Sequence, residues 1–267
     1  MSGQKPLDSI KLRGYNVGRA GNNTSVYRKG RIGMAGVFEE AISKHVIEIR
    51  FRPDGRFLDI RGKIAGDLTL SSTLFKHWNI SSNRIDFSSG DNPHVKAFFS
   101  YRNLGLISAY PNRTTFFAES AGNFIKSAWP RLPNRHFSRI GVRSTVLVEA
   151  DDFEKAFDAY RKHFLKLSDE DIRKFGGDLV DVGFPMNFAD GKNYFNVVTG
   201  PMEKEQSKKY FGELDLPSVG VFVDVDYFRK DLPLNIGQGT VVRLLKEGVE
   251  KAKGVTTLIV NWVSERS

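Results

Sequence analysis

Cysteine is absent from this chain of 267 residues. Its absence excludes disulfides, thiolate zinc sites, iron–sulfur ligation and thiol nucleophiles. Long apolar runs are absent too. None approaches the roughly 18 residues of a membrane-spanning helix, and none follows the first basic residues as in a secretory signal. We therefore expect a cytoplasmic protein with no membrane partner.

Recognisable catalytic motifs are also missing. The five histidines stand singly, without the H-E-x-x-H spacing of a zinc protease. No G-x-S-x-G sequence marks a nucleophilic serine on a sharp turn. The sequence therefore nominates no catalytic residue and requires no cofactor.

Apolar residues make up 40% of the chain and charged residues 27%, which is typical of a globular protein. The net charge is +9, and it is concentrated in two segments. Residues 1–36 hold seven bases and one acid, a net charge of +6, and residues 126–143 hold five bases and no acid. The rest of the chain therefore carries −2, so we expect two basic segments on a weakly acidic body.

The two basic segments supply the candidate contacts to an acidic protein partner or a nucleic acid, because bases neutralise phosphates and carboxylates while aromatics stack on nucleobases. The candidates in residues 1–36, which we expect to form a flexible arm, are Arg13, Arg19, Arg28, Lys29 and Arg31. Those in the second segment are Lys126, Trp129, Arg131, Arg135, Arg139 and Arg143. Alternatively, Arg139 and Arg143 are outward residues of a strand, paired with acids such as Asp151, Asp152 or Glu154.

Period-two alternation and closely spaced turns predict an α+β fold with largely antiparallel sheet. The expected strands are 45–52, 57–60, 83–87, 95–101, 104–110, 113–119, 139–149, 179–188, 193–199 and 219–227. The expected helices are 120–129, 153–167, a short one from 169, 201–210 and the C-terminal segment. The pattern leaves open whether the strands form one sheet or two sheet-plus-helix subdomains.

The prolines at 130 and 133 suggest a division of the chain. We expect a basic arm over 1–36, a β-rich subdomain over 37–133 that ends in a helix, and an α+β subdomain over 134–267 with C-terminal helices.

Two weaker motifs lie near the end of the chain. Asp224 and Asp226 share one face of a strand, where two carboxylates could bind Mg²⁺ or Mn²⁺ together with phosphate oxygens. Gly237, Gly239 and Thr240 open the C-terminal helix, where exposed backbone amides could bind a phosphate. The alternatives are that the aspartates form salt bridges with arginines and that Thr240 caps the helix.

The order of several segments resembles a sporadically distributed, functionally uncharacterised bacterial family of about 250–270 residues. The resemblance rests on HVIEIRFRP at 45–53, RIGVR at 139–143, VFVDVDYF at 221–228 and the helical C-terminus. The sequence departs from that pattern in its long basic arm and in Ser144, where an aromatic residue commonly stands. The resemblance implies a cytoplasmic bacterial accessory protein, patchily inherited as are genes that act in conflict with phage or mobile elements.

These observations favour a non-enzymatic binding, adaptor or regulatory protein that engages an acidic protein or a nucleic acid through its basic segments. The first alternative is a metal-dependent enzyme that handles nucleotides or phosphates through the aspartates and the glycine-rich helix start. The second alternative is a structural subunit of a larger assembly.

Overall fold

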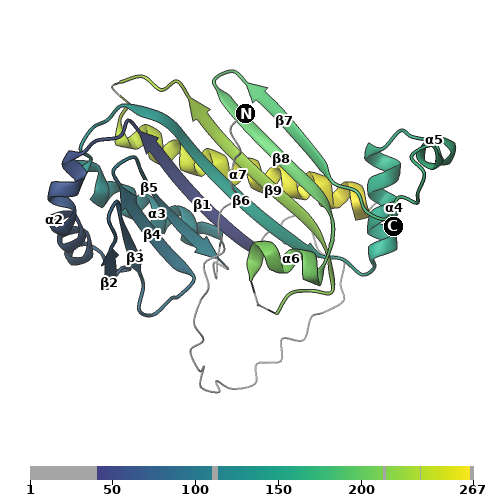
Figure 1. Ribbon diagram of the computed structural model, residues 1–267, viewed down its shortest axis with the longest axis horizontal. Coiled ribbons are helices and arrows are strands. Elements are labelled where there is room, and N and C mark those ends of the chain that lie inside the picture. The colour runs from purple at the N-terminus through teal and green to yellow at the C-terminus, as the bar shows by residue number, and fades with distance from the viewer. Residues whose placement is uncertain (1–40, 110–113, 213–214, 235, 265–267) are drawn as a thin grey trace, which may run out of the picture. The chain divides into compact units, whose positions relative to one another are not determined.

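A nine-stranded, fully antiparallel sheet forms the centre of the fold (Figure 1). A computed structural model describes residues 41–109, 114–212, 215–234 and 236–264. The strands lie in the order β2-β3-β4-β5-β1-β6-β9-β8-β7. Their bounds are β1 Ile42–Phe51, β2 His77–Ile80, β3 Arg84–Ser88, β4 Val95–Ser100, β5 Asn103–Ala109, β6 Phe137–Glu149, β7 Phe184–Asp190, β8 Asn193–Glu203 and β9 Val219–Lys230.

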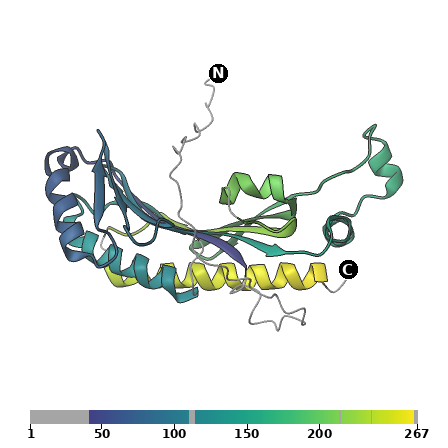
Figure 2. The same ribbon diagram turned by 90° about the horizontal axis from the view of Figure 1, so that it is seen from below.

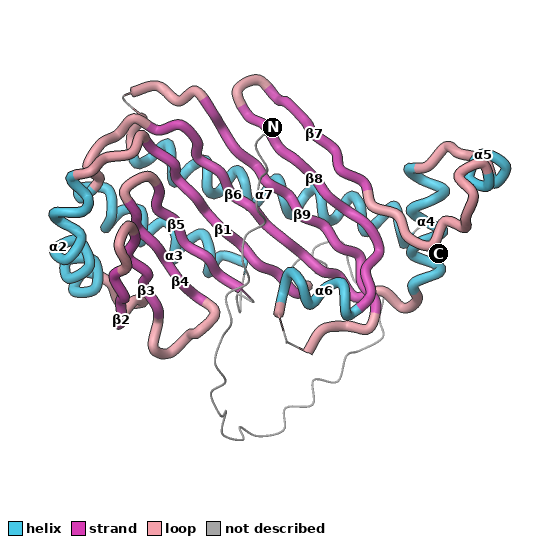
Figure 3. The backbone as a smooth tube through the Cα atoms, viewed as in Figure 1, coloured by secondary structure: helices cyan, strands magenta, loops and turns pink. Residues whose placement is uncertain are grey.

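Six α-helices and one 3₁₀ turn accompany the strands in the described part of the chain (Figure 3). They are α2 Arg56–Ser71, α3 Thr114–Ala128, η1 Trp129–Arg131, α4 Phe153–Phe164, α5 Asp169–Arg173, α6 Lys204–Phe211 and α7 Gln238–Ser264. None of the helices that the structure describes combines the length and apolar composition needed to cross a membrane.

One face of the sheet is covered by helices. Figure 2 shows α3 and α7 on one side of the strands and α6 on the other. Strand alternation explains the difference, because Ile140, Val142 and Val146 of β6 and Val223 and Val225 of β9 point to the same side and are buried. They belong to the two main hydrophobic clusters, which α2, α3, α4 and α7 complete.

The long helix α7 lies tightly against β6 and β9 at one glycine. A Cβ atom at Gly248 would lie 2.7 Å from Cβ of Val142 and 3.2 Å from Cδ1 of Tyr227. Only a residue without a side chain allows this approach of helix to sheet, so Gly248 lets α7 pack closely on the covered face.

The opposite side of the sheet, which we call the open face, is covered by the described residues only at one end. There α6 places Phe211 against Leu147 and Phe222 in a small hydrophobic cluster that also includes Leu216. The remaining outward residues of β1, β6 and β9 lie beyond that cluster and are mostly charged or polar. The fold therefore leaves a polar surface at the centre of its sheet.

The α+β class and the antiparallel arrangement predicted from the sequence are confirmed. The two β regions share one sheet, because β1 pairs with β6 across the proposed boundary near residue 133. The subdomain boundary itself stays a prediction. The arm of residues 1–36 lies outside the described residues, and with it Arg13, Arg19, Arg28, Lys29 and Arg31.

Two predicted strands are wrong. Residues 57–60 belong to helix α2, since Asp54 accepts the Arg56 amide at 3.0 Å and Phe57, Ile64 and Leu68 recur at helical spacing on a buried stripe. Helix α3 begins at Thr114, where a strand over 113–119 was expected, and buries Phe117, Ala121 and Ile125.

Candidate functional site

Two arginines of the second basic segment, Arg139 and Arg143, lie beside the two aspartates on the open face. Strands β6 and β9 pair so that Arg143 stands opposite Asp226 and Thr145 opposite Asp224. Because side chains two apart in a strand share a face, Arg139, Arg143 and Thr145 of β6 face outward together with both aspartates. The structure thus brings together arginines that the sequence assigned to partner binding and aspartates that it assigned to metal binding.

The arginines and aspartates form close ion pairs. Arg143 donates from Nε to both carboxylate oxygens of Asp224, at 2.9 and 3.0 Å, and the hydroxyl of Thr145 donates to Oδ1 of Asp224 at 2.7 Å. Arg139 donates from Nη2 to both oxygens of Asp226, at 2.6 and 2.7 Å. The alternative considered for the aspartates was that they form salt bridges with arginines, and the structure shows these salt bridges. Arg139 pairs with Asp226, and Arg143 pairs with Asp224.

Gly141 makes the pairing of Arg139 with Asp226 possible. A Cβ atom at position 141 would lie 2.7 Å from Nη1 and 2.8 Å from Cζ of Arg139. The guanidinium therefore lies along its own strand over the glycine, and it stacks on the ring of Phe228 at 4.5 Å. The R-I-G-V-R sequence is the local reason for this arrangement.

Strand β1 extends the group across the sheet. Arg50 binds Glu48 through Nε at 2.8 Å, and the side-chain amide of Asn103 donates to the same carboxylate at 2.7 Å. Arg139 lies 3.8 Å from Glu48, so it stands between two carboxylates. We call the group formed by Glu48, Arg50, Arg139, Arg143, Asp224 and Asp226 the arginine–carboxylate network.

In two pairs of this network the positive charge faces solvent more than the negative charge does. The side chain of Arg143 is 53% exposed and that of Asp224 only 6%. Arg50 is likewise 53% exposed and Glu48 only 20%. In these two pairs the acid lies beneath the arginine, whereas in the third pair Asp226 is 26% exposed and Arg139 16%.

The electrostatics follow from this burial. The hydrogen bond to Asp224 raises the pKa of Arg143. Burial, followed by the positive charge of Arg143, lowers the pKa of the neighbouring Lys44, although Asp224 opposes the shift. Burial alone would raise the pKa of Glu48, but hydrogen bonds from Arg50 and Asn103 and the nearby arginine charges together lower it. These contacts therefore favour the ionised form of the Glu48 carboxylate.

Arg143 keeps donors for an additional ligand. In the described part of the chain it donates only from Nε, so its Nη1 and Nη2 groups make no hydrogen bond there. A guanidinium has five N–H donors in a planar fork that suits a carboxylate or a phosphate. Arg143 is thus held in place on one side and directed at solvent on the other.

The other candidates of the second basic segment lie apart from the network. Trp129 is buried and stacks on Phe137 at 5.4 Å, with Arg135 over its ring at 5.6 Å. Arg131 donates to Asp67 at 3.3 Å and to the carbonyl of Ser127 at 2.6 Å. Lys126 lies on α3, on the helix-covered side. The structure therefore does not gather the segment into one patch.

The sheet also separates the two late motifs. Asp224 and Asp226 lie on the open face, whereas Gly237, Gly239 and Thr240 lie at the start of α7, which packs against the opposite face. The Thr240 amide donates to the carbonyl of Gly237 at 3.0 Å, an ordinary bond of a first helical turn. No three potential metal ligands come together within the ranges that the structure describes.

Sequence reasoning missed the contribution of β1. Glu48 and Arg50 alternate with Ile47 and Ile49, so the sequence did show that both face away from the core. It gave no sign that β1 would pair with β6. It also missed Lys230, which lies 5.7 Å from the ring of Tyr194 and 5.1 Å from that of Phe228 on the same face.

Known protein families and curated proteins give no match to this chain. The resemblance to the bacterial family therefore stays a prediction. The fold defines an α+β protein whose sheet has one helix-covered face and one open face. Its function must be inferred from the open face.

Proposed function

We propose that this is a non-enzymatic binding protein that docks an acidic protein partner on its open face. One observation carries the proposal: Arg143 is anchored by Asp224, its side chain is 53% exposed, and its two Nη groups make no hydrogen bond within the described residues. An anchored guanidinium loses less side-chain entropy on binding than a free one, so the network preorganises the surface for a carboxylate.

A protein partner agrees better with the mixed charges than a nucleic acid does. Phosphates follow one another closely along a strand and need a continuous positive groove. On the open face Asp224, Asp226 and Glu48 alternate with the arginines at hydrogen-bond distance, so a phosphate chain would also meet carboxylates. A protein surface offers separate carboxylates and hydrogen-bond donors that match such a pattern.

The experiment compares two double variants of the full chain with equal charge. The test variant is Arg50→Gln with Arg143→Gln, and the control is Arg56→Gln with Arg243→Gln, two exposed arginines outside the open face. Binding of a labelled poly-glutamate peptide is measured by fluorescence anisotropy at low and high salt. We expect the test variant to weaken binding about tenfold and the control about twofold or less.

Two results would overturn the proposal. One is an equal loss in both double variants, because net charge alone would then explain binding. The other is an unchanged affinity for poly-glutamate with a loss for a labelled single-stranded oligonucleotide measured in parallel. The second result would identify nucleic acid as the partner.

A further inference from the structure

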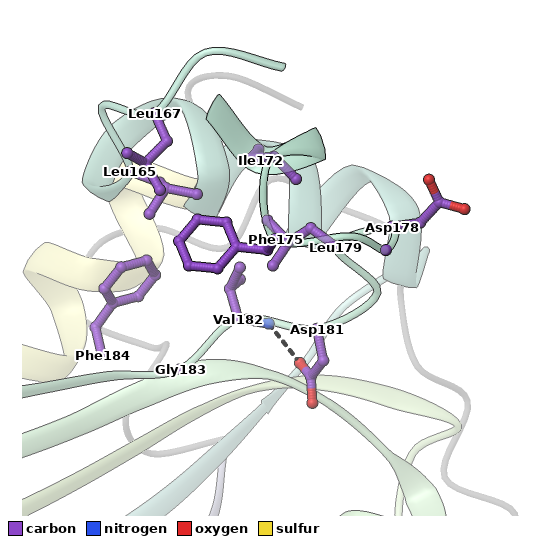
Figure 4. A pocket seen from close by; sticks show the side chains of 11 residues that line it. Leu165, Leu167, Ile172, Phe175, Asp178, Leu179, Asp181, Val182, Gly183 and Phe184 are labelled. Carbon is purple, nitrogen blue, oxygen red and sulfur yellow. Dashed lines mark hydrogen bonds between the residues drawn. The ribbon is translucent and has the colours of Figure 1, made fainter. Parts of the chain in front are cut away.

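An excursion of the chain between α4 and β7 carries an apolar pocket (Figure 4). The excursion runs over residues 165–183 and contains the short helix α5, which buries none of its residues. Helix α5 begins with a complete capping box, in which Ser168 and Asp171 bond to each other's backbone amides. The excursion is therefore locally ordered, and it contributes Val182 to the hydrophobic core.

Large apolar side chains on this excursion are left in solvent. Phe175 is 81% exposed, Val180 is 77% exposed, and Leu167 is also exposed. Isolated apolar residues on a surface are ordinary, but a cluster of them around a hollow marks an interaction site. These side chains line or flank the same pocket, so they form such a cluster.

The pocket has the size and lining of a binding site. Its volume is about 490 Å³, within the range of sites that hold a small ligand or a few side chains. The ring of Phe175 lies among Leu165, Leu179 and Val182, and Phe184 closes one side (Figure 4). Gly176, with a φ of +83°, and Gly177 follow Phe175 directly.

Among the described residues, the charged ones that line the pocket are both acidic. Asp178 and Asp181 lie at one side, with their carboxylates directed away from the apolar side chains (Figure 4). Asp181 accepts hydrogen bonds from the Val182 amide at 2.7 Å and from Gln206 at 3.0 Å. Neither aspartate forms an ion pair with any residue of the described ranges, whereas the nearby Arg161 and Lys174 are paired with acids of α5.

We propose that this pocket binds an apolar segment of a partner protein that carries a lysine or arginine beside its apolar side chain. The apolar side chain would fill the space around Phe175, and the cation would lie against Asp178 and Asp181. The charge preference is opposite to that of the open face, so the two surfaces would select different partners. This proposal does not depend on the function proposed for the open face.

The test uses two short labelled peptides of matched length, one of leucine and lysine and one of leucine and glutamate. The two peptides are compared on the full-length Arg50→Gln, Arg143→Gln double variant, because the open face is itself proposed to bind acidic peptides. We expect this variant to bind the lysine peptide and to bind the glutamate peptide at least about tenfold more weakly. We expect Phe175→Ala, which removes an exposed side chain and should leave the fold intact, to weaken the lysine peptide about tenfold. The double change Asp178→Asn with Asp181→Asn should weaken it about fivefold and reduce its salt dependence.

The matched control is Leu70→Ala, because Leu70 is exposed on α2 outside the pocket lining. Equal binding of the lysine peptide to the Phe175→Ala variant and to wild type would overturn the proposal, as would equal affinity for the two peptides. Sedimentation of the free protein provides a separate check. A dimer that Phe175→Ala dissociates would overturn the proposal, because a second copy of the chain would then occupy the pocket.

Discussion

Arg143 and Asp224 join the neighbouring strands β6 and β9 of the open face although they lie 81 positions apart in the chain. The carboxylate is buried and takes three hydrogen bonds, two from Nε of Arg143 and one from Thr145. A buried carboxylate needs such partners, since desolvation of an unpaired charge costs several kcal/mol. The pair therefore stabilises the arrangement of β6 and β9 at the candidate surface and also contributes to its charge.

Removing the charge of Asp224 should destabilise the protein. In Asp224→Asn the partly buried Lys44 and Arg143 lose the acid between them, so the free energy of unfolding should fall by about 1 to 2 kcal/mol, less than for a fully buried pair because Arg143 is half in water. Urea denaturation measures the change, with Asp91→Asn, whose ion pair is exposed, as a control that should have little effect. A double-mutant cycle with Arg143→Gln should give a favourable coupling, and a coupling of zero would contradict the ion pair.

Metal binding at Asp224 and Asp226 would have to displace two guanidiniums. Since each aspartate already accepts two hydrogen bonds from an arginine, we expect millimolar Mg²⁺ or Mn²⁺ with nucleotide to leave the melting temperature within about 1 °C. Differential scanning fluorimetry tests this directly. A rise of several degrees that disappears in Asp224→Asn would restore the metal-dependent enzyme as the better interpretation.

The sequence predicts local elements of this fold well and their partners poorly. Alternation identifies β1 and β9, and the Asp-Gly turn identifies the β7–β8 hairpin, where Gly191 has a φ of +59°. The predicted strand over 57–60 is wrong because the helix that replaces it depends on burial against Phe99 of β4, a contact between distant segments. The network depends in the same way on the β6–β9 register, which no local pattern encodes.

His45 should make stability depend on pH. It is buried on β1, with Nδ1 2.9 Å from the hydroxyl of Ser144 and its ring stacked on Phe117 at 5.1 Å, and burial lowers its pKa from 6.5 to about 4. His45 therefore becomes protonated below pH 6.5 in the unfolded chain but only near pH 4 in the folded protein. Stability should be complete above pH 6.5 and fall by roughly 3 kcal/mol as the pH drops toward 4.

The His45→Gln variant isolates this effect from the protonation of carboxylates. Its urea midpoint should be lower than that of wild type at pH 7, and the difference between the two proteins should shrink steadily as the pH falls from 6.5 to 4. A difference that stays constant over this window would show that His45 is protonated equally in the folded and unfolded states.

Alanine substitutions at two glycines of α7 test which face of the sheet the helix covers. Alanine is a better helix former than glycine by about 1 kcal/mol, so Gly254→Ala, where nothing lies within 4 Å of the added methyl, should raise stability by roughly that amount. At Gly248 the same methyl would lie 2.7 Å from Cβ of Val142, and overpacking should exceed the gain in helix propensity and lower stability by about 1 to 2 kcal/mol. Urea midpoints of the two variants should thus move in opposite directions. If both rise together, α7 does not pack on Val142 and Tyr227, and the face that carries Arg143 and Asp224 would not be the one left open.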